Sequence, residues 1–489
     1  MPFHCSMAWW EAWLPFSRKD GSALRPGARR QPASESPEVP RQTPVACTAT
    51  GGMRPARSPA ELGLTAYDRR MTGTAGWRPL VEGESREHAL RVARELAESL
   101  EEHARRVPLS ASLSGGAAGL ALLFTWLDRV HASAHDAVMA ERLLGEAMDA
   151  VASRPMGATL YSGMTGVAWA VEHLTGGGEE EEGNGLEDVD AVLARRLGVS
   201  PWTAGFDLIS GLAGLGVYAL ERLPRADARR CLEGVVSRLA ELAEERPEGL
   251  TWKTQPQWLP EEKQREQPHG RYDLGVAHGV PGLIPVLAGA VRAGVAVEHA
   301  WRLLRGAWNW VMAQRLPQAG MRLPHAILPD RAPSPSRPAW CYGDVGASLA
   351  MHTAARAVGE ATWKADALAM AQAAASSPVE DSGVTDVPLC HGAAGLLHVY
   401  NRLYQATGEE VFATAARRWL EITLRQRQPG QGIGGYAYMT WDDRGTQVWA
   451  ERPGLLEGTA GIALALLAAA SSVEPTWDRV LLMSLRGVQ

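Results

Sequence analysis

Hydrophobic residues along this chain follow two alternating patterns, one with a single apolar face and one that is apolar on all sides. In the first pattern, apolar residues recur at spacings of three and four with arginine and glutamate between them, which predicts amphipathic helices. These helices are expected at residues 84–107, 225–245, 297–314, 361–375 and 410–427. The second pattern has no polar face and therefore predicts buried helices.

Each buried segment begins at a small repeated motif, Gly-x-x-Gly followed by an apolar run. The motif occurs seven times, and its first glycines are Gly116, Gly163, Gly211, Gly279, Gly343, Gly392 and Gly458. Successive motifs are 47, 48, 68, 64, 49 and 66 residues apart, which is typical of a repeat architecture. We interpret each repeat as an outer amphipathic helix, a turn and an inner buried helix, with glycines that allow a sharp entry and close packing.

Seven such hairpins predict an all-α fold, an α/α toroid with seven inner and seven outer helices. An open solenoid is the alternative, but inner helices this apolar favour a closed ring. The three longer spacings between motifs contain insertions rich in Trp, Pro and Gly, at about residues 249–273, 317–339 and 429–451. All three precede a motif, so we expect loops or small β elements at one end of the ring, around its mouth.

The N-terminal 75 residues differ from the rest of the chain. Nine of the 31 prolines lie before residue 60, and no helical periodicity is present there. We expect residues 1–75 to be a disordered extension, or an upstream misreading of a start codon at Met71. The toroid is expected to span residues 76–489, and the glutamate-rich run at 176–183 is interpreted as a solvated loop.

The amino-acid composition excludes several classes of function. The chain has 49 Lys and Arg against 55 Asp and Glu. It therefore lacks the excess of positive charge that is typical of nucleic-acid-binding proteins. No uninterrupted apolar run reaches the ~18 residues of a membrane helix, and the run at residues 461–470 ends too early, so no integral membrane segment is expected, while peripheral association stays open. Five cysteines without staple spacing indicate a reducing, cytoplasmic location and leave cysteine available for metal binding or catalysis.

Aligning the seven motifs on their first glycine brings unusual residues into register. The residues just before it are Gly115, Ser162, Ser210, His278, Tyr342, His391 and Glu457. The residues two before it are Ser114, Tyr161, Ile209, Ala277, Cys341, Cys390 and Leu456. In a closed ring these positions meet at one end of the central cavity, so Cys341, Cys390 and His391 predict a zinc site with an open fourth position. The alternative is that both cysteines are small buried hydrophobes.

Other residues near the motifs are candidates for catalysis, each with a structural alternative. His278 is in the same register and is expected to act as a general acid or base, although a lone histidine is usually structural. Asp207 either orients His278 or caps a helix. Arg337 is either an anion-stabilising group or a rim charge, and Tyr342 and Glu457 are either donors to the cavity or packing residues.

At these residues the sequence resembles the lanthionine cyclase family, the LanC-like proteins, over roughly residues 85–470. The motifs that carry the resemblance are RPAWCYGD (337–344), PLCHGAAGLL (388–397), AHGVPGL (277–283), DLISGLAGLG (207–216) and LLEGTAGIAL (455–464). The resemblance implies an α/α toroid with zinc on Cys341, Cys390 and His391. It also implies that His278, Asp207, Arg337 and Tyr342 occupy the active-site positions of the family.

The family reaction is a Michael-type addition of a peptide Cys thiol to dehydroalanine or dehydrobutyrine, which forms lanthionine or methyllanthionine rings. The resemblance thus implies a dehydrated precursor peptide as substrate and a separate dehydratase. Metal binding would deprotonate the thiol, whose free pKa is ~8.5. The alternatives are a scaffold that only binds thiols or peptides, an enzyme that adds glutathione, a zinc prenyltransferase-like toroid, and a toroidal glycosidase that uses Glu457 and Asp344.

Overall fold

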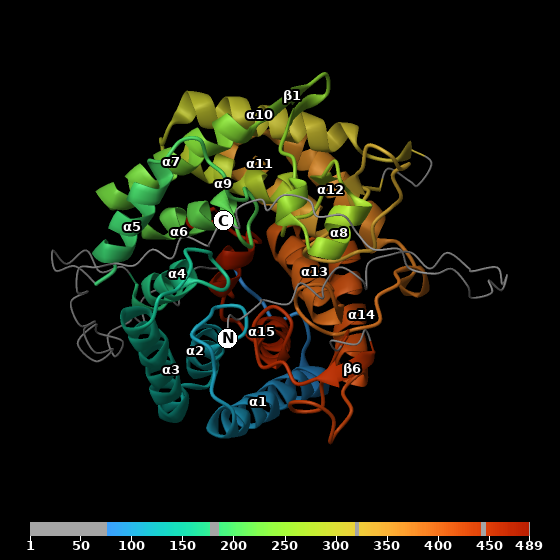
Figure 1. Cartoon of the computed structure of the whole chain (residues 1–489). Helices are drawn as coiled ribbons and strands as arrows, with labels where there is room; N and C mark the ends of the chain where they lie inside the picture. The colour runs from blue at the N-terminus through green and yellow to red at the C-terminus, as the bar shows by residue number, and fades with distance from the viewer. Residues whose placement is uncertain (1–75, 177–184, 318–321, 442–445, 489) are drawn as a thin grey trace, which may run out of the picture.

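The computed structural model describes residues 76–176, 185–317, 322–441 and 446–488, so the predicted extension at 1–75 and most of the glutamate-rich run lie outside the described residues. Two concentric layers of helices form a ring (Figure 1). The inner helices are α2 (Ala117–His131), α4 (Met164–Thr175), α6 (Leu212–Arg222), α9 (Val280–Arg292), α11 (Asp344–Val358), α13 (Ala393–Thr407) and α15 (Thr459–Ala470). The outer helices are α1 (Gly83–Arg106), α3 (Ala134–Ser153), α5 (Glu187–Leu197), α7 (Ala226–Leu242), α10 (Val297–Ala313), α12 (Ala361–Ala375) and α14 (Glu410–Arg425). The predicted all-α toroid is confirmed.

Each inner helix begins at the residue after the first glycine of its motif. The second glycine lies in the first turn, where the segment that precedes the helix folds back against it. A Cβ atom at Gly166 would lie 1.8 Å from the carbonyl oxygen of Leu160, and one at Gly346 would lie 1.9 Å from that of Trp340. The motif therefore contains two glycines because a side chain at the second position would collide with backbone.

The ring is closed, so the open solenoid alternative is wrong. Helix α15 packs against both α1 and α2, which joins the last repeat to the first. Backbone hydrogen bonds also connect neighbouring repeats just before the inner helices. The donors and acceptors are Ser114 N to Tyr161 O, Leu208 N to Ala277 O, Ala277 N to Cys341 O, Cys341 N to Cys390 O, Cys390 N to Leu456 O, and Leu456 N to Ser114 O. Residues far apart in sequence therefore meet at one end of the ring.

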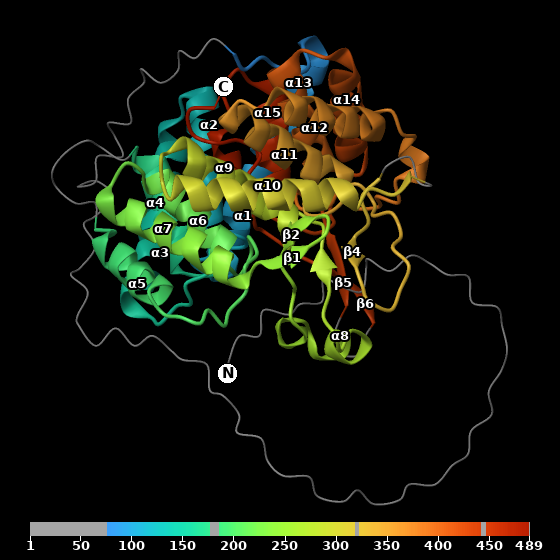
Figure 2. The same ribbon diagram turned by 90° about the horizontal axis from the view of Figure 1, so that it is seen from above.

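The insertions decorate that same end, as predicted (Figure 2). Their described residues form three antiparallel pairs of strands: β1 (Glu244–Arg246) with β2 (Gly249–Thr251), β3 (Tyr272–Asp273) with β4 (Ala326–Ile327), and β5 (Tyr438–Trp441) with β6 (Gln447–Ala450). A short helix, α8 (Glu261–Glu266), lies between β2 and β3. One predicted helix, residues 225–245, is too long by three residues, because the chain leaves α7 at Leu242 to pair β1 with β2.

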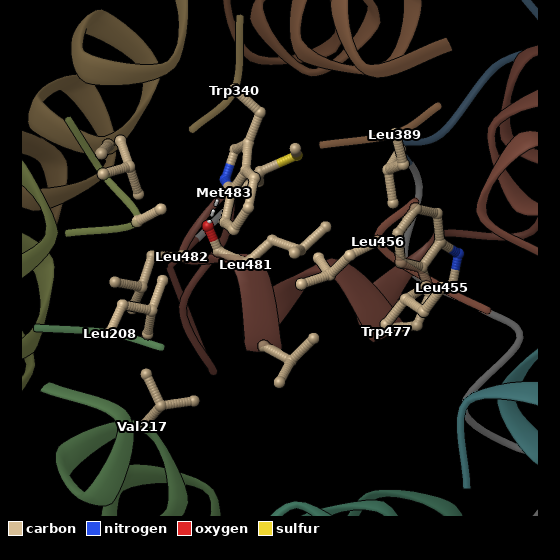
Figure 3. Packing of buried hydrophobic residues seen from close by; sticks show 14 of the residues in the cluster. Leu208, Val217, Trp340, Leu389, Leu455, Leu456, Trp477, Leu481, Leu482 and Met483 are labelled. Atoms are coloured by element: carbon tan, nitrogen blue, oxygen red, sulfur yellow. Dashed lines mark hydrogen bonds between the residues drawn. The ribbon is translucent and has the colours of Figure 1, made fainter. Parts of the chain in front are cut away.

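The C-terminal residues 471–488, here called the axial segment, were not anticipated from the sequence. After α15 the chain returns to the middle of the ring, where residues Thr476–Leu481 form a 3₁₀ helix. Its carbonyls accept hydrogen bonds from several repeats: Tyr161 Oη donates to Val480 at 2.8 Å, and Trp340 Nε1 donates to Leu481 at 2.9 Å. Leucines that precede the inner helices pack on it from around the ring (Figure 3). The axial segment thus fills the space beneath the motifs.

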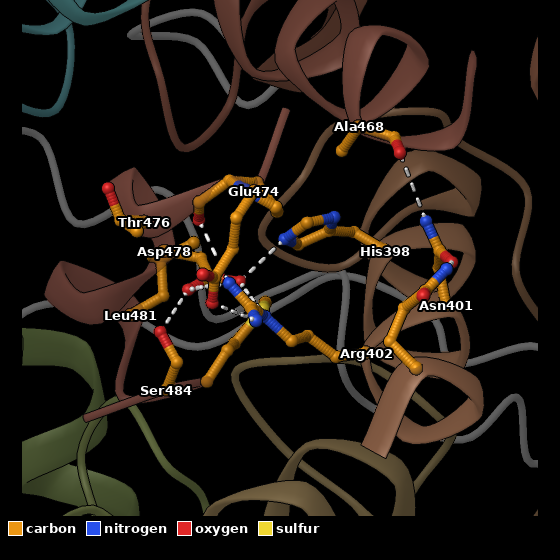
Figure 4. Close-up of polar contacts among 12 residues, drawn as sticks. His398, Asn401, Arg402, Ala468, Glu474, Thr476, Asp478, Leu481 and Ser484 are labelled. Carbon is orange, nitrogen blue, oxygen red and sulfur yellow. Dashed lines mark hydrogen bonds and ion pairs between the residues drawn. The ribbon is translucent and has the colours of Figure 1, made fainter. Parts of the chain in front are cut away.

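A buried carboxylate, Asp478, anchors this segment (Figure 4). Arg402 donates two hydrogen bonds to it, from Nε to Oδ2 at 2.7 Å and from Nη2 to Oδ1 at 3.0 Å. Nε2 of His398 lies 2.9 Å from Oδ2, and Ser484 Oγ donates to Oδ1 at 2.5 Å. Burial alone would raise the pKa of Asp478, but Arg402 and His398 hold it well below its ordinary value. The segment is therefore tied to α13 by a charged network.

We expect Asp478→Ala to lower the free energy of unfolding by about 3–5 kcal/mol, because it removes the buried partner of Arg402 and leaves this cation only with the partly exposed Glu474. Urea unfolding followed by circular dichroism measures the change. Glu410→Ala is the control, since the Glu410–Arg417 pair is exposed and its loss should cost less than about 1 kcal/mol. Equal losses in the two variants would show that the network contributes nothing particular to the fold.

None of the described helices is both long enough and apolar enough to cross a membrane.

Candidate metal centre and active site

Two sulfurs and an imidazole meet at the mouth of the ring. Cys341 lies three residues before α11, and Cys390 and His391 lie just before α13. All three are buried, and one ligand atom from each lies within 4.8 Å of the others. The hydrogen bond from Cys341 N to Cys390 O, at 3.2 Å, holds the two backbone segments that precede α11 and α13 next to one another. The structure therefore brings together the three residues that the register of the repeats predicts as ligands, in a group that could hold a metal ion.

The charges in this cluster suit a metal ion. Burial acts to raise the pKa of Cys341, but hydrogen bonds with Cys390 and His391 lower it to about 5. Burial and the neighbouring Cys341 raise the pKa of Cys390 well above its usual value. Burial acts to lower the pKa of His391, but Asp386 and Cys341 outweigh it and raise it to about 10. The cluster thus stabilises a thiolate, the form of cysteine that binds metals, close to the N-termini of two helices.

The imidazole of His391 is held from outside the cluster by a carboxylate. Its Nε2 atom lies 3.1 Å from Oδ2 of Asp386, a residue in the segment that leads into α13. Metal-binding histidines commonly donate their second ring N–H to such a partner, which fixes the tautomer and the ring orientation. Asp386 was not among the candidates from the sequence.

His278 and Asp207 meet beside this cluster. Nδ1 of His278, which precedes α9, lies 2.7 Å from Oδ2 of Asp207, which precedes α6. The other oxygen of Asp207 accepts hydrogen bonds from the backbone N–H and the hydroxyl of Ser210, at 2.7 and 2.9 Å. Asp207 therefore contacts both His278 and the start of its own helix. Burial acts to lower the pKa of His278, but Asp207 outweighs it and the pKa is raised.

Tyr342 lies between His278 and the insertions. Its ring stacks on that of His325 with centroids 4.0 Å apart, and its centroid is 6.3 Å from that of His278. The hydroxyl of Tyr342 donates to Oδ1 of Asp273 at 3.1 Å, and Asp273 in turn is paired with Arg271. Burial lowers the pKa of His325 to about 3, so this ring is neutral. The insertions therefore fix the orientation of Tyr342.

Arg337 and Glu457 lie near His391, each through one intervening residue. Nη1 of Arg337 is 3.9 Å from Oδ1 of Asp386, so the guanidinium lies close to the partner of His391. Glu457 accepts a hydrogen bond at 2.9 Å from the hydroxyl of Tyr438, whose ring meets that of His391 edge-on. Burial raises the pKa of Glu457 to about 7. Arg337 and Glu457 thus reach His391 through Asp386 and Tyr438 respectively.

The residues that sequence reasoning missed include Asp273 and Asp386, for which a signal was present. The position six residues before each first glycine is occupied by Ser110, Gly157, Gly205, Asp273, Arg337, Asp386 and Arg452. Charged side chains therefore fill this register in repeats four to seven, with alternating sign. Among these four, Arg337 is the residue that a second signal, its closeness to Cys341, also marks as a candidate. His325 and Tyr438 lie in the insertions, where the repeats give no register.

Two comparisons with known proteins agree with the resemblance seen in the motifs. The model of the family described as lanthionine synthetase C-like protein matches residues 107–482. Among solved structures, the chain is similar to nisin cyclase, with a TM-score of 0.65 and 20% sequence identity over 80% of this chain and 97% of that one. The structural likeness shows a shared fold, and the family match covers most of the chain. The resemblance seen in the motifs is confirmed: the chain belongs to the lanthionine synthetase C-like protein family.

Proposed function

We propose that this protein is a zinc-dependent lanthipeptide cyclase, which adds Cys thiols of a dehydrated precursor peptide to dehydroalanine or dehydrobutyrine. The observation that carries the proposal is the buried cluster of Cys341, Cys390 and His391, with ligand atoms within 4.8 Å of one another. Membership of the family and a fold shared with nisin cyclase support it. Among the described residues, the group that could hold a metal contains two cysteines and a histidine and no carboxylate, whereas the prenyltransferase alternative requires a carboxylate ligand.

The donor set fits zinc. Two thiolates and one imidazole are ligands that zinc prefers, and three protein ligands are the arrangement of catalytic rather than structural zinc sites. Cys341, Cys390 and His391 would hold the ion, and the fourth position would be left for substrate. When bound, zinc supplies the positive charge that converts a substrate thiol, with a free pKa of ~8.5, into a thiolate.

The remaining chemistry belongs to residues of this chain. Attack of the substrate sulfur on the β-carbon forms a C–S bond, breaks the C=C π bond and leaves an enolate. The positive charge of Arg337, together with the N-termini of the inner helices, would stabilise this anion. His278 would then give a proton to the α-carbon from Nε2, because its Nδ1 is engaged with Asp207. The proton lost by the thiol balances the proton gained by carbon.

Incubation with dehydrated peptides tests the proposal. Synthetic peptides with one dehydroalanine and one cysteine, at several spacings, are treated with the purified zinc-loaded protein and then alkylated. Ring closure leaves the peptide mass unchanged but removes the thiol, so we expect the alkylation mass increment to disappear. A folded, zinc-loaded protein that leaves every peptide fully alkylatable would contradict a cyclase and indicate a binding scaffold.

The same assay with added glutathione separates two sources of thiol. A cyclase gives the unalkylated peptide at its original mass, whether or not glutathione is present. An enzyme that adds a free thiol gives a product heavier by one glutathione, with the peptide cysteine still alkylatable. We expect the first result, and we expect the natural precursor to come from a separate dehydratase.

A further inference from the structure

The carboxylate of Asp386 lies between the metal cluster and the cationic side of the site. Its Oδ2 atom is 3.1 Å from Nε2 of His391, and its Oδ1 atom is 3.9 Å from Nη1 of Arg337. The side chain is 25% exposed, but its Oδ1 atom is buried and makes no hydrogen bond within the part of the chain that the structure describes. We propose that Asp386 is a positioning residue, which orients His391 toward the metal and holds Arg337 beside it. The inference rests on the proposed zinc-dependent function.

The contact with His391 decides which ring nitrogen binds the metal. A carboxylate at Nε2 accepts the N–H of that nitrogen, so the lone pair of the neutral ring is placed on Nδ1. The negative charge of Asp386 also makes the imidazole a stronger donor. His391 follows Cys390 directly, so its backbone is fixed by the start of α13, while its ring depends on a side-chain partner for orientation.

The contact with Arg337 follows from the repeat. Arg337 and Asp386 both lie six residues before the first glycine of their motifs, in adjacent repeats five and six. The backbone hydrogen bond between Cys341 and Cys390 holds these repeats together, so residues in the same register become neighbours across it. Arg337 also donates from Nη1 to the carbonyl of Gly383 at 3.4 Å, three residues before Asp386. One segment, residues 383–391, therefore holds both the arginine and the metal ligand.

A structural role in capping α13 does not account for this side chain. The bond that ties this position to the helix is a backbone one, from Ala393 N to the carbonyl of Asp386 at 2.9 Å. The helix cap itself is Gly392, which has no side chain to donate or accept. Among the described residues, the charged groups that the carboxylate faces are His391 and Arg337.

Zinc affinity measured without peptide tests the inference. Competition with a chromophoric chelator should show that Asp386→Ala binds zinc about 10- to 100-fold more weakly than the wild type. Asp386→Asn keeps an acceptor for the N–H of His391 but not the charge, so its loss should be smaller. Asp381→Ala is the matched control, an exposed aspartate in the same connecting segment, and should bind zinc as the wild type does.

A second readout concerns Arg337. With saturating zinc, Asp386→Ala should lower kcat for ring closure, and adding Arg337→Ala should lower it little further, because the arginine is already displaced. Wild-type zinc affinity in both Asp386 variants would overturn the inference, even if the wild type closes rings. Loss of affinity in these variants would sustain it even if the wild type closed no ring, in which case only the proposed function would fail. If Asp386→Ala does not fold, the Asn variant decides.

Discussion

Replacement of His391 by alanine is expected to abolish zinc binding and ring closure together. The variant leaves two sulfurs and no nitrogen donor in the cluster, and it removes one of the two hydrogen-bonding partners that lower the pKa of Cys341. Activation by a metal ion supplies several kcal/mol of the barrier, so the rate should fall by a factor on the order of 10³ or more. Elemental analysis and the thiol-alkylation assay on one preparation measure both effects.

His352→Ala is the matched control for this experiment. His352 is a buried histidine within the body of α11, and no cluster of metal-ligating groups among the described residues includes it. It should retain zinc and activity even if it loses some stability. A His391→Ala protein that closes rings without metal would refute the assignment of the centre.

His278→Ala is expected to keep its zinc and to close rings about 10²- to 10⁴-fold more slowly, the usual contribution of a general acid. The variant removes the proposed proton donor but none of the three candidate metal ligands. Single-turnover kinetics at saturating zinc measure the rate, and elemental analysis confirms the metal. An unchanged rate would leave His278 with a structural role only.

The pH profile identifies the donor more directly. If His278 is the general acid, as proposed, its protonated form is the active one, so the rate should fall as the pH rises through its pKa, which Asp207 holds above the ordinary value of ~6.5. Asp207→Asn removes the charge that raises this pKa, so the fall should move to lower pH. In His278→Ala the fall should disappear, and a profile that is identical in all three proteins would assign the titration to another group.

The fold was predictable because the repeat places the same physical constraint seven times in the sequence. At each motif the second glycine faces a backbone carbonyl, as Gly166 does at Leu160, so no other residue fits. The candidate metal centre was predictable for the same reason. In a closed ring, residues at the same position of adjacent repeats lie next to one another. Cys341 and Cys390 are such residues, and a backbone hydrogen bond joins them.

The axial segment could not be predicted from the sequence by these means. It is a short 3₁₀ helix flanked by irregular chain, so it has neither a helical nor a strand period. Its contacts, such as that between Trp340 and Leu481, join residues 141 positions apart and occur once each. His325 and Tyr438 were missed because insertions lie outside the repeat. Asp386, in contrast, was predictable, because it lies six residues before the first glycine of its motif, where repeats four to seven all have a charged residue.

The central claim, that two sulfurs and one imidazole bind a single zinc ion, is tested most directly by X-ray absorption at the zinc edge. The protein as purified should contain zinc with two sulfur neighbours at ~2.3 Å and at least one imidazole nitrogen at ~2.0–2.1 Å. Adding a thiol-containing dehydrated peptide should raise the number of sulfur neighbours. A zinc environment of oxygen and nitrogen alone, or a folded protein that takes up no zinc, would contradict the account.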